Sequence, residues 1–312
     1  MTSSVGRAAI VGAGVIGASW AALFLAKGLK VVATDVAADA EASLRGFVDK
    51  AWPALERLGL APGASPAHLA FTPDLAVAID GADFVQESGP ERIDLKQALY
   101  RRLDELAPAN VIIASSSSGL MMSEIQKGCA AHPERCVIGH PFNPPHLIPL
   151  VEVVGGAKTS PETIERAMAF YRAIGKKPIH LHKEVVGHVA NRLQAALWRE
   201  VVHLIEEGVV DVADADAAVC WGPGLRWGVM GPNLIFHLGG GQGGMRHFLD
   251  HLSGPFAAWW RDLGTQTEFS PAATKALIDG AEKEAGDRSI DQLARQRDEA
   301  LLGLLALRAK ER

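Results

Sequence analysis

Residues 8–26 of the chain read AAIVGAGVIGASWAALFLA, a stretch without a charged residue. Within it, Gly12, Gly14 and Gly17 form the pattern G-x-G-x-x-G, directly after an expected strand and before an expected helix. In that setting the first glycine permits a tight turn, the second lets a pyrophosphate approach the backbone, and the third packs helix on strand. The stretch therefore predicts a dinucleotide-binding βαβ unit rather than a signal peptide or a membrane span.

The residues around this turn indicate which dinucleotide it would hold. Val15 and Ile16 open the expected helix, whose N-terminal N–H groups would face the phosphates. Asp35 ends the next expected strand, where a carboxylate accepts hydrogen bonds from a ribose 2′-hydroxyl and repels a 2′-phosphate. The first arginine after it is Arg45. We therefore expect NAD rather than NADP.

The first 185 residues alternate short apolar runs with helical stretches, which is typical of a doubly wound sheet. The runs lack polar alternation, as strands buried on both faces do. The expected strands are 7–11, 29–34, 82–86, 110–114, 136–139 and 151–154, and the expected helices are 15–27, 38–58, 94–106 and 160–174. An amphipathic helix at 191–207 and a charged helical tail at 271–312 follow. The sequence predicts an α/β fold: a Rossmann-like, doubly wound, mainly parallel sheet at 1–185, then an all-α C-terminal domain at 186–312.

Composition narrows the classes of function. Lys plus Arg number 31 and Asp plus Glu 36, giving a net charge of -5, so no basic field exists to hold nucleic acid or an anionic membrane. Cys129, Cys136 and Cys220 lack the spacing of a disulfide framework and indicate core thiols of a cytoplasmic protein. Five of the seven tryptophans, at 198, 221, 227, 259 and 260, are interpreted as apolar filling of the helical domain or of its dimer interface.

A histidine and a glutamate suggest acid–base chemistry. His140 follows the strand 136–139, at the edge where doubly wound sheets bind ligands, and Glu152 stands twelve residues further on. The prolines between them force a reversal that could bring the carboxylate back to the imidazole. There it would fix the tautomer of a base that removes a hydroxyl proton. From spacing alone, a structural histidine is an equal alternative.

Two further clusters of polar residues stand at strand ends. Ser115–Gly119 follow the strand 110–114, where hydroxyls can donate to a substrate or a cofactor, or cap the next helix. No G-x-S-x-G pattern surrounds them, so a serine nucleophile is not expected. His180 and His182 could share a metal, but no third ligand is evident nearby, and we interpret them as exposed strand polarity rather than as a metal site.

Together these motifs resemble the L-3-hydroxyacyl-CoA dehydrogenase superfamily over nearly the whole chain. The resemblance is carried by the glycine turn, PERIDLK (90–96), the serine cluster, HPFNP (140–144), LVEVV (150–154) and GHVANRL (187–193). It implies an NAD-dependent oxidoreductase that forms a homodimer through its C-terminal helices, which would also take part in substrate binding. By position it implies the catalytic residues His140, Glu152, Ser118 and Asn191, and the cofactor contacts Asp35, Glu91 and Lys96. Ser116 stands where the long-chain members have an asparagine that contacts the cofactor.

Two branches of the superfamily look closest, the L-carnitine 3-dehydrogenases and the lambda-crystallin type L-gulonate 3-dehydrogenases. AWPAL (51–55), QES (86–88), GLRW (224–227) and GMRHF (244–248) resemble the first branch, and the double proline at 144–145 and Gly231-Pro232 look more like the second. The candidate substrate contacts are Ser118, Phe142, Asn143, His146, Asn191, Arg226 and Trp227. Phe142 and Trp227 could face a trimethylammonium group through cation–π contacts, and His146 replaces a tyrosine of the carnitine pattern.

Charge also bears on the substrate. The excursion at 37–71 carries only Arg45, Lys50 and Arg57 as Lys or Arg, few for the phosphates of CoA. We therefore expect NAD-dependent oxidation of the 3-hydroxyl of a small free L-3-hydroxy acid to the 3-keto acid, with Arg226, Arg246 or Arg192 as candidates for its carboxylate. A short-chain L-3-hydroxyacyl-CoA dehydrogenase and a non-catalytic NAD-binding structural protein are the alternatives.

Overall fold

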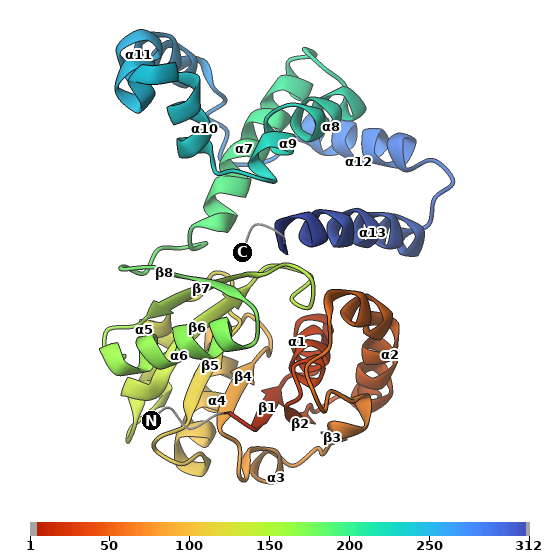
Figure 1. Cartoon of the computed structure of the whole chain (residues 1–312), viewed down its shortest axis with the longest axis vertical. Helices are drawn as coiled ribbons and strands as arrows, with labels where there is room; N and C mark the ends of the chain where they lie inside the picture. Colours follow the sequence, from red (N-terminus) through yellow and green to blue (C-terminus); the bar gives the residue numbers. More distant parts are fainter. Residues whose placement is uncertain (1–4, 310–312) are drawn as a thin grey trace. The chain divides into compact units, whose positions relative to one another are not determined.

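The structure is a computed structural model that describes residues 5–309. The chain divides into two compact units, one up to Asn191 and one from Arg192 on. Figure 1 shows the sheet of the first unit and the helices of the second. The strands are β1 (Arg7–Val11), β2 (Lys30–Thr34), β3 (Leu69–Phe71), β4 (Phe84–Glu87), β5 (Ile112–Ser115), β6 (Cys136–Pro141), β7 (Leu150–Gly155) and β8 (Lys177–His180). The helices of the first unit are α1 (Val15–Ala26), α2 (Ala40–Leu58), α3 (Leu75–Ile79), α4 (Ile93–Leu106), α5 (Met122–Ile125) and α6 (Pro161–Ala173).

The eight strands form one sheet in the order β3-β2-β1-β4-β5-β6-β7-β8. Every neighbouring pair is parallel except β6 and β7, which confirms a doubly wound, mainly parallel sheet. The strand order reverses between β1 and β4, the kind of position where such sheets bind dinucleotides. The expected elements did not include β3, α3 or α5, each of which has only three to five residues. The strand expected at His180 had no predicted bounds, and β8 ends at that residue.

The sheet is buried on both faces, as its apolar strands predict. Ala8 and Ile10 of β1 pack into one core with α1, α2 and α6, whereas Ala9 and Val11 pack into a second core with α3, α4 and α5. In the first core the fully buried Trp20 of α1 lies 5.6 Å, ring to ring, from Tyr171 of α6. Alternate side chains of one strand thus fix the helices of both layers.

The second unit is helical. It contains most of α7 (Ala190–Glu206) and all of α8 (Val212–Trp221), α9 (Pro223–Trp227), α10 (Pro232–Gly239), α11 (Gly244–Asp262), α12 (Pro271–Ala285) and α13 (Ile290–Ala309). The expected single tail is two helices, since Gly286 adopts a φ of 58° after α12.

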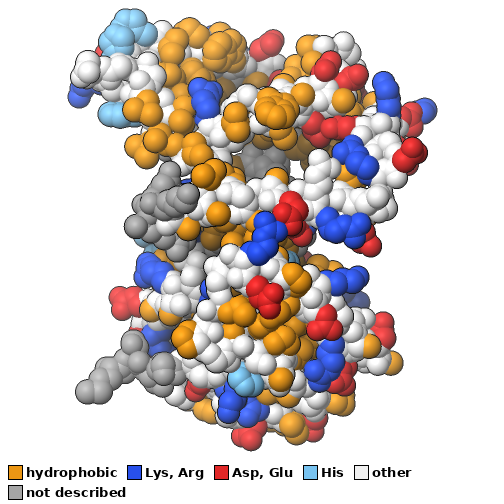
Figure 2. All heavy atoms as spheres, turned by 45° about the vertical axis from the view of Figure 1, so that its right-hand side comes forward, with side chains coloured by type: hydrophobic (Ala, Val, Ile, Leu, Met, Phe, Trp, Pro, Cys, Tyr) orange, Lys and Arg blue, Asp and Glu red, His pale blue; other side chains and the backbone are white. Residues whose placement is uncertain are grey.

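Apolar side chains of the second unit remain largely uncovered, and Figure 2 shows hydrophobic groups gathered on its surface. Trp221 is 79% and Trp260 69% exposed, so these two do not fill the core of the helical domain, and their alternative place in a dimer interface stays a prediction. Cys220 is exposed too, although the other two thiols are buried as expected.

Among residues 5–309, no helix is long and apolar enough to cross a membrane. His180 and His182 are both exposed, with ring centroids 4.6 Å apart, and the same residues contain no group of three His, Cys, Asp or Glu side chains that could hold a metal ion.

Candidate active site

The glycine turn has the shape that its pattern predicts. Gly12 has a φ of 94°, and a Cβ there would lie 2.7 Å from the carbonyl carbon of Ser88. A Cβ on Gly17 would lie 1.8 Å from the carbonyl oxygen of Gly12, whereas a Cβ on Gly14 would meet nothing within 4 Å. No side chain caps α1, and its first turn has no acidic residue. The open backbone at Gly14 and the uncapped helix N-terminus therefore fit a pyrophosphate.

Asp35 lies directly after β2, beside this turn. One carboxylate oxygen accepts from the N–H of Ala13 at 2.7 Å, and the other accepts from the N–H of Ala37 at 3.0 Å. The carboxylate thus joins the end of β2 to the glycine turn, and its charge lies where an adenosine ribose is expected.

His140 and Glu152 face each other across the antiparallel pair β6 and β7. The imidazole Nδ1 lies 2.8 Å from Glu152 Oε2, and the two residues are 5% and 0% exposed. Although burial raises the pKa of Glu152, hydrogen bonds from His140, Ala190 and Val189 lower it below its usual value. An ionised carboxylate only accepts, so Nδ1 carries a proton, and in the neutral form of the imidazole the lone pair is on Nε2. The contact expected from the proline-rich reversal is present.

Glu152 has a second contact that sequence reasoning missed. Its Oε1 accepts from the N–H groups of Val189 and Ala190, at 2.8 and 2.9 Å, where α7 begins. The next residue is Asn191. One buried carboxylate therefore orients His140 and fixes the start of the helix that carries Asn191.

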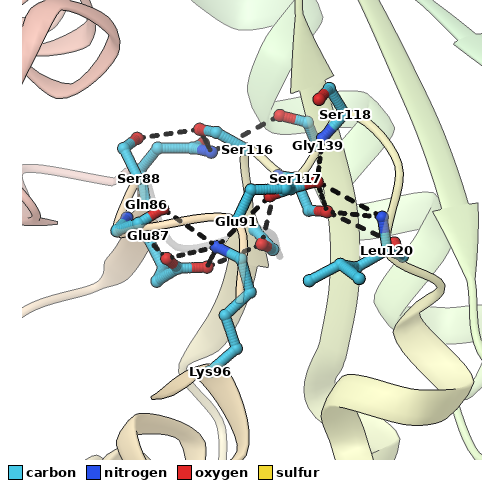
Figure 3. A network of polar contacts seen from close by, with 12 residues as sticks. Gln86, Glu87, Ser88, Glu91, Lys96, Ser116, Ser117, Ser118, Leu120 and Gly139 are labelled. Atoms are coloured by element: carbon cyan, nitrogen blue, oxygen red, sulfur yellow. Dashed lines mark hydrogen bonds and ion pairs between the residues drawn. The ribbon is translucent and has the colours of Figure 1, made fainter. Parts of the chain in front are cut away.

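A turn after β5 holds Ser118, and Glu91 fixes that turn (Figure 3). Glu91 Oε1 accepts from the Ser117 hydroxyl at 2.6 Å and from the N–H groups of Ser118 and Gly119 at 3.0 and 2.8 Å. Burial opposes ionisation, but these bonds and the Lys96 ammonium hold the pKa of Glu91 below its usual value. Glu91 therefore positions the backbone of the serine turn.

Lys96 lies beneath this turn and is 2% exposed. Its ammonium contacts both carboxylate oxygens of Glu87, at 2.7 and 3.0 Å, and the carbonyl oxygen of Gly89 at 3.2 Å. Ser115 also donates to Glu87. Since an ammonium has three hydrogens, these contacts use all of them, and Lys96 supports the loop after β4 from below.

Sequence reasoning also missed His188, although the GHVANRL motif contains it. Its ring centroid lies 5.1 Å from that of His140, its Nε2 lies 3.1 Å from the Ser117 carbonyl oxygen, and it is 2% exposed. A carbonyl can only accept, so Nε2 carries a proton. Burial lowers the pKa of His188. A neutral imidazole at this position thus links the start of α7 to the serine turn.

The candidate substrate contacts belong to several elements of the chain. The Phe142 ring lies 6.0 Å from that of His140, whereas His146 turns to α1 and α2, with Nδ1 2.8 Å from Ser19 Oγ and its ring 5.7 Å from Phe47. Asn143 is exposed in the loop after β6, and Arg226 and Trp227 belong to α9 of the second unit. Among Phe142, Asn143, His146, Arg226 and Trp227, the described ring contact with His140 is that of Phe142.

Known proteins that are similar to this chain come from one family of dehydrogenases. The profile of the 3-hydroxyacyl-CoA dehydrogenase NAD binding domain matches residues 7–185, and that of the C-terminal domain matches residues 187–280. The chain is 50% identical to an L-carnitine dehydrogenase of Streptomyces griseus over 96% of this chain and 89% of that protein. It is 48% identical to an L-carnitine dehydrogenase of Burkholderia mallei over 96% and 92%. A solved 5-formyl-3-hydroxy-2-methylpyridine 4-carboxylic acid 5-dehydrogenase, an NAD+ dependent dismutase, superposes with a TM-score of 0.83 at 32% identity, over 97% of this chain and 98% of that one.

Proposed function

The chain belongs to the 3-hydroxyacyl-CoA dehydrogenase family and is an NAD-dependent oxidoreductase, and we propose that it oxidises the 3-hydroxyl of L-carnitine to the 3-keto acid. The observation that carries the proposal is the buried His140–Glu152 pair, with 2.8 Å between nitrogen and oxygen, in a chain half identical to L-carnitine dehydrogenases. Bound NAD supplies the hydride acceptor for this chemistry.

His140 is the general base of this proposal. Its Nδ1–H donates to Glu152, so Nε2 accepts the proton of the 3-hydroxyl and the imidazolium that forms faces a buried carboxylate. Ser118 and Asn191 hold the substrate oxygen. Neither side chain makes a hydrogen bond that the structure records among residues 5–309, so both remain available to a ligand.

Phe142 is the proposed aromatic contact for the trimethylammonium group. Its ring meets the His140 ring edge to face and is partly exposed. A quaternary ammonium cannot accept or donate an ordinary hydrogen bond, so an aromatic face beside the base suits it better than a polar side chain. A free 3-hydroxy acid also fits the sparse cations of the segment 37–71.

A substrate panel tests the proposal. L-carnitine, D-carnitine, L-gulonate, L-3-hydroxybutyrate and its CoA ester are each incubated with NAD and with NADP, and NADH or NADPH formation is followed by absorbance. We expect the highest kcat/KM for L-carnitine with NAD. His140→Ala should lower turnover by about 10²-fold or more while NAD affinity holds. A preference for the CoA ester would refute the proposed substrate, and near-normal turnover of the variant would refute the base.

The assembly and the division of labour between units are proposals as well. We propose that residues 186–312 form a substrate and dimerisation domain of a cytoplasmic homodimer, because apolar side chains such as Trp221, Leu234 and Trp260 are 60 to 79% exposed there. Light scattering on the purified protein should give twice the chain mass of 33.1 kDa. A mass that stays at that of one chain across the concentration range would refute the dimer.

A further inference from the structure

A chain of hydrogen bonds runs from α6 to the loop after β4. The Tyr171 hydroxyl lies 2.7 Å from Gln86 Oε1, and Gln86 Nε2 lies 2.8 Å from Ser116 Oγ and 3.4 Å from the Gly139 carbonyl oxygen. A carbonyl oxygen can only accept, so the nitrogen of the amide must face Gly139. The amide orientation is thereby fixed, and Gln86 donates to Ser116.

The Ser116 hydroxyl has three hydrogen-bonding partners but can accept only two hydrogen bonds. The indole N–H of Trp20 also donates to Ser116 Oγ, at 3.2 Å, and the Ser88 hydroxyl lies 2.8 Å away. A hydroxyl oxygen accepts two hydrogen bonds and donates one. Trp20 and Gln86 fill the two acceptor sites, so Ser116 must donate to Ser88. Figure 3 shows this contact between the ends of β4 and β5.

Ser88 therefore receives a hydrogen bond and keeps its own hydrogen. Among residues 5–309 the structure records no acceptor for that hydrogen. The backbone of Ser88 is fixed against the glycine turn, since its N–H donates to the Val11 carbonyl at 2.7 Å and its carbonyl carbon abuts Gly12. Ser88 thus lies directly after β4 and beside β1, where the strand order reverses. Its hydroxyl group has a hydrogen to donate, for which no acceptor is recorded among residues 5–309.

We propose that Ser88 binds the cofactor, by donating its hydroxyl hydrogen to an oxygen of the nicotinamide riboside half of NAD. Asp35, directly after β2, marks the adenosine side of the turn, and Ser88 lies on its other side, directly after β4. The proposal assigns Ser116 an indirect part: its hydroxyl is used within the protein and orients Ser88. It depends on NAD binding alone, so it stands whichever hydroxy acid is the substrate.

Binding measurements on the intact protein test this assignment. NAD, ADP-ribose and ADP are titrated calorimetrically into the wild type, Ser88→Ala and the control Ser43→Ala, whose side chain is exposed on α2. One neutral hydrogen bond corresponds to a loss of NAD affinity of about three- to tenfold. We expect that loss in Ser88→Ala, with ADP binding unchanged and Ser43→Ala like the wild type. A matching loss for ADP-ribose assigns the acceptor to the ribose, and a loss for NAD alone assigns it to the carboxamide.

The indirect role of Ser116, which we call the relay, is tested separately from the contact between Ser88 and NAD. Ser116→Ala and the double variant are titrated at a temperature below the unfolding transition of each protein, so that lower stability is not mistaken for lower affinity. If Ser116 acts through Ser88, the double variant binds NAD no more weakly than Ser88→Ala. Additive losses would mean that Ser116 contacts the cofactor itself, and would overturn the relay. Unchanged NAD affinity in Ser88→Ala, or an equal loss for ADP, would overturn the assignment of Ser88.

Discussion

Replacing Glu152 with glutamine tests the proposed mechanism most directly, because the structure determines which way the new amide must turn. Glu152 Oε1 accepts two N–H groups at the start of α7, whereas Oε2 accepts, among residues 5–309, only the Nδ1–H of His140. If the glutamine directed its NH2 group at the N–H groups of Val189 and Ala190, donor would face donor. Both N–H groups and the NH2 group would then be unpaired in a buried site. Its oxygen must therefore stay with α7, and its NH2 must face His140.

The amide in that orientation reverses the tautomer of His140. Facing an N–H donor, Nδ1 becomes the acceptor, and the proton of the neutral ring moves to Nε2, the atom that has to take the substrate proton. In a triad where a carboxamide imposes the wrong histidine tautomer, turnover falls about 10⁴-fold. The neutral amide also cannot stabilise an imidazolium. We expect Glu152→Gln to lower kcat by about 10³ to 10⁴-fold, at a cost of only about 1–2 kcal/mol in unfolding free energy.

The assay compares kcat, NAD affinity and urea unfolding for the wild type, Glu152→Gln and Glu165→Gln, a matched control on the exposed face of α6. Only kcat of the first variant should fall steeply. A kcat within tenfold of the wild type would refute the tautomer argument, and so would an equal fall in NAD affinity, because Glu152 is assigned no contact with the cofactor.

Three further predictions concern charges at defined positions. Asp35→Ser should raise the preference for NADP over NAD by at least about tenfold in kcat/KM, because the carboxylate that repels a 2′-phosphate is gone. Burial lowers the pKa of Lys176 to about 7 from 10.5, so the unfolded chain binds more protons above pH 7 and stability rises with pH. Urea unfolding of Lys176→Met should lack that rise, which is about 1 kcal/mol per pH unit between pH 7 and 10. His188 has a pKa below 6.5, so its burial costs stability as pH falls through 6.5; His188→Gln should unfold with a shallower acid dependence, and an identical dependence would contradict a neutral His188.

The sheet could be predicted from the sequence because its signals are local. The strand 7–11, the glycine turn and the helix that follows lie within twenty residues and agree with the structure to one residue. The two strands whose bounds were not predicted, β3 and β8, have three and four residues and lie at the edges of the sheet. These strands pair with residues that are distant in the sequence. Three or four residues are also too few to show the hydrophobic periodicity from which a strand is predicted.

Polar networks were the least predictable part of the site. Ser88, Ser116 and Tyr171 come from three separate elements, and only the packed sheet brings them together. Position within the serine cluster implied a cofactor contact for Ser116, yet its hydroxyl is fully used by protein partners. The requirement for Gly139 also arises only in the folded chain. A Cβ at this position would lie 1.9 Å from the Tyr171 hydroxyl, and the sequence around residue 139 does not indicate that contact.

The antiparallel strand β7 explains why a histidine and a glutamate twelve residues apart meet at one point. The connection between β6 and β7 covers only residues 142–149, whereas a parallel crossover needs a dozen residues or more. The short, proline-rich connection therefore forces an antiparallel partner, and residues opposite each other in such a pair direct their side chains to the same face. His140 opposite Glu152 is the result. The one antiparallel pair of the described sheet thus supplies the carboxylate, and a βαβ crossover at this point would have separated the proposed base from its partner.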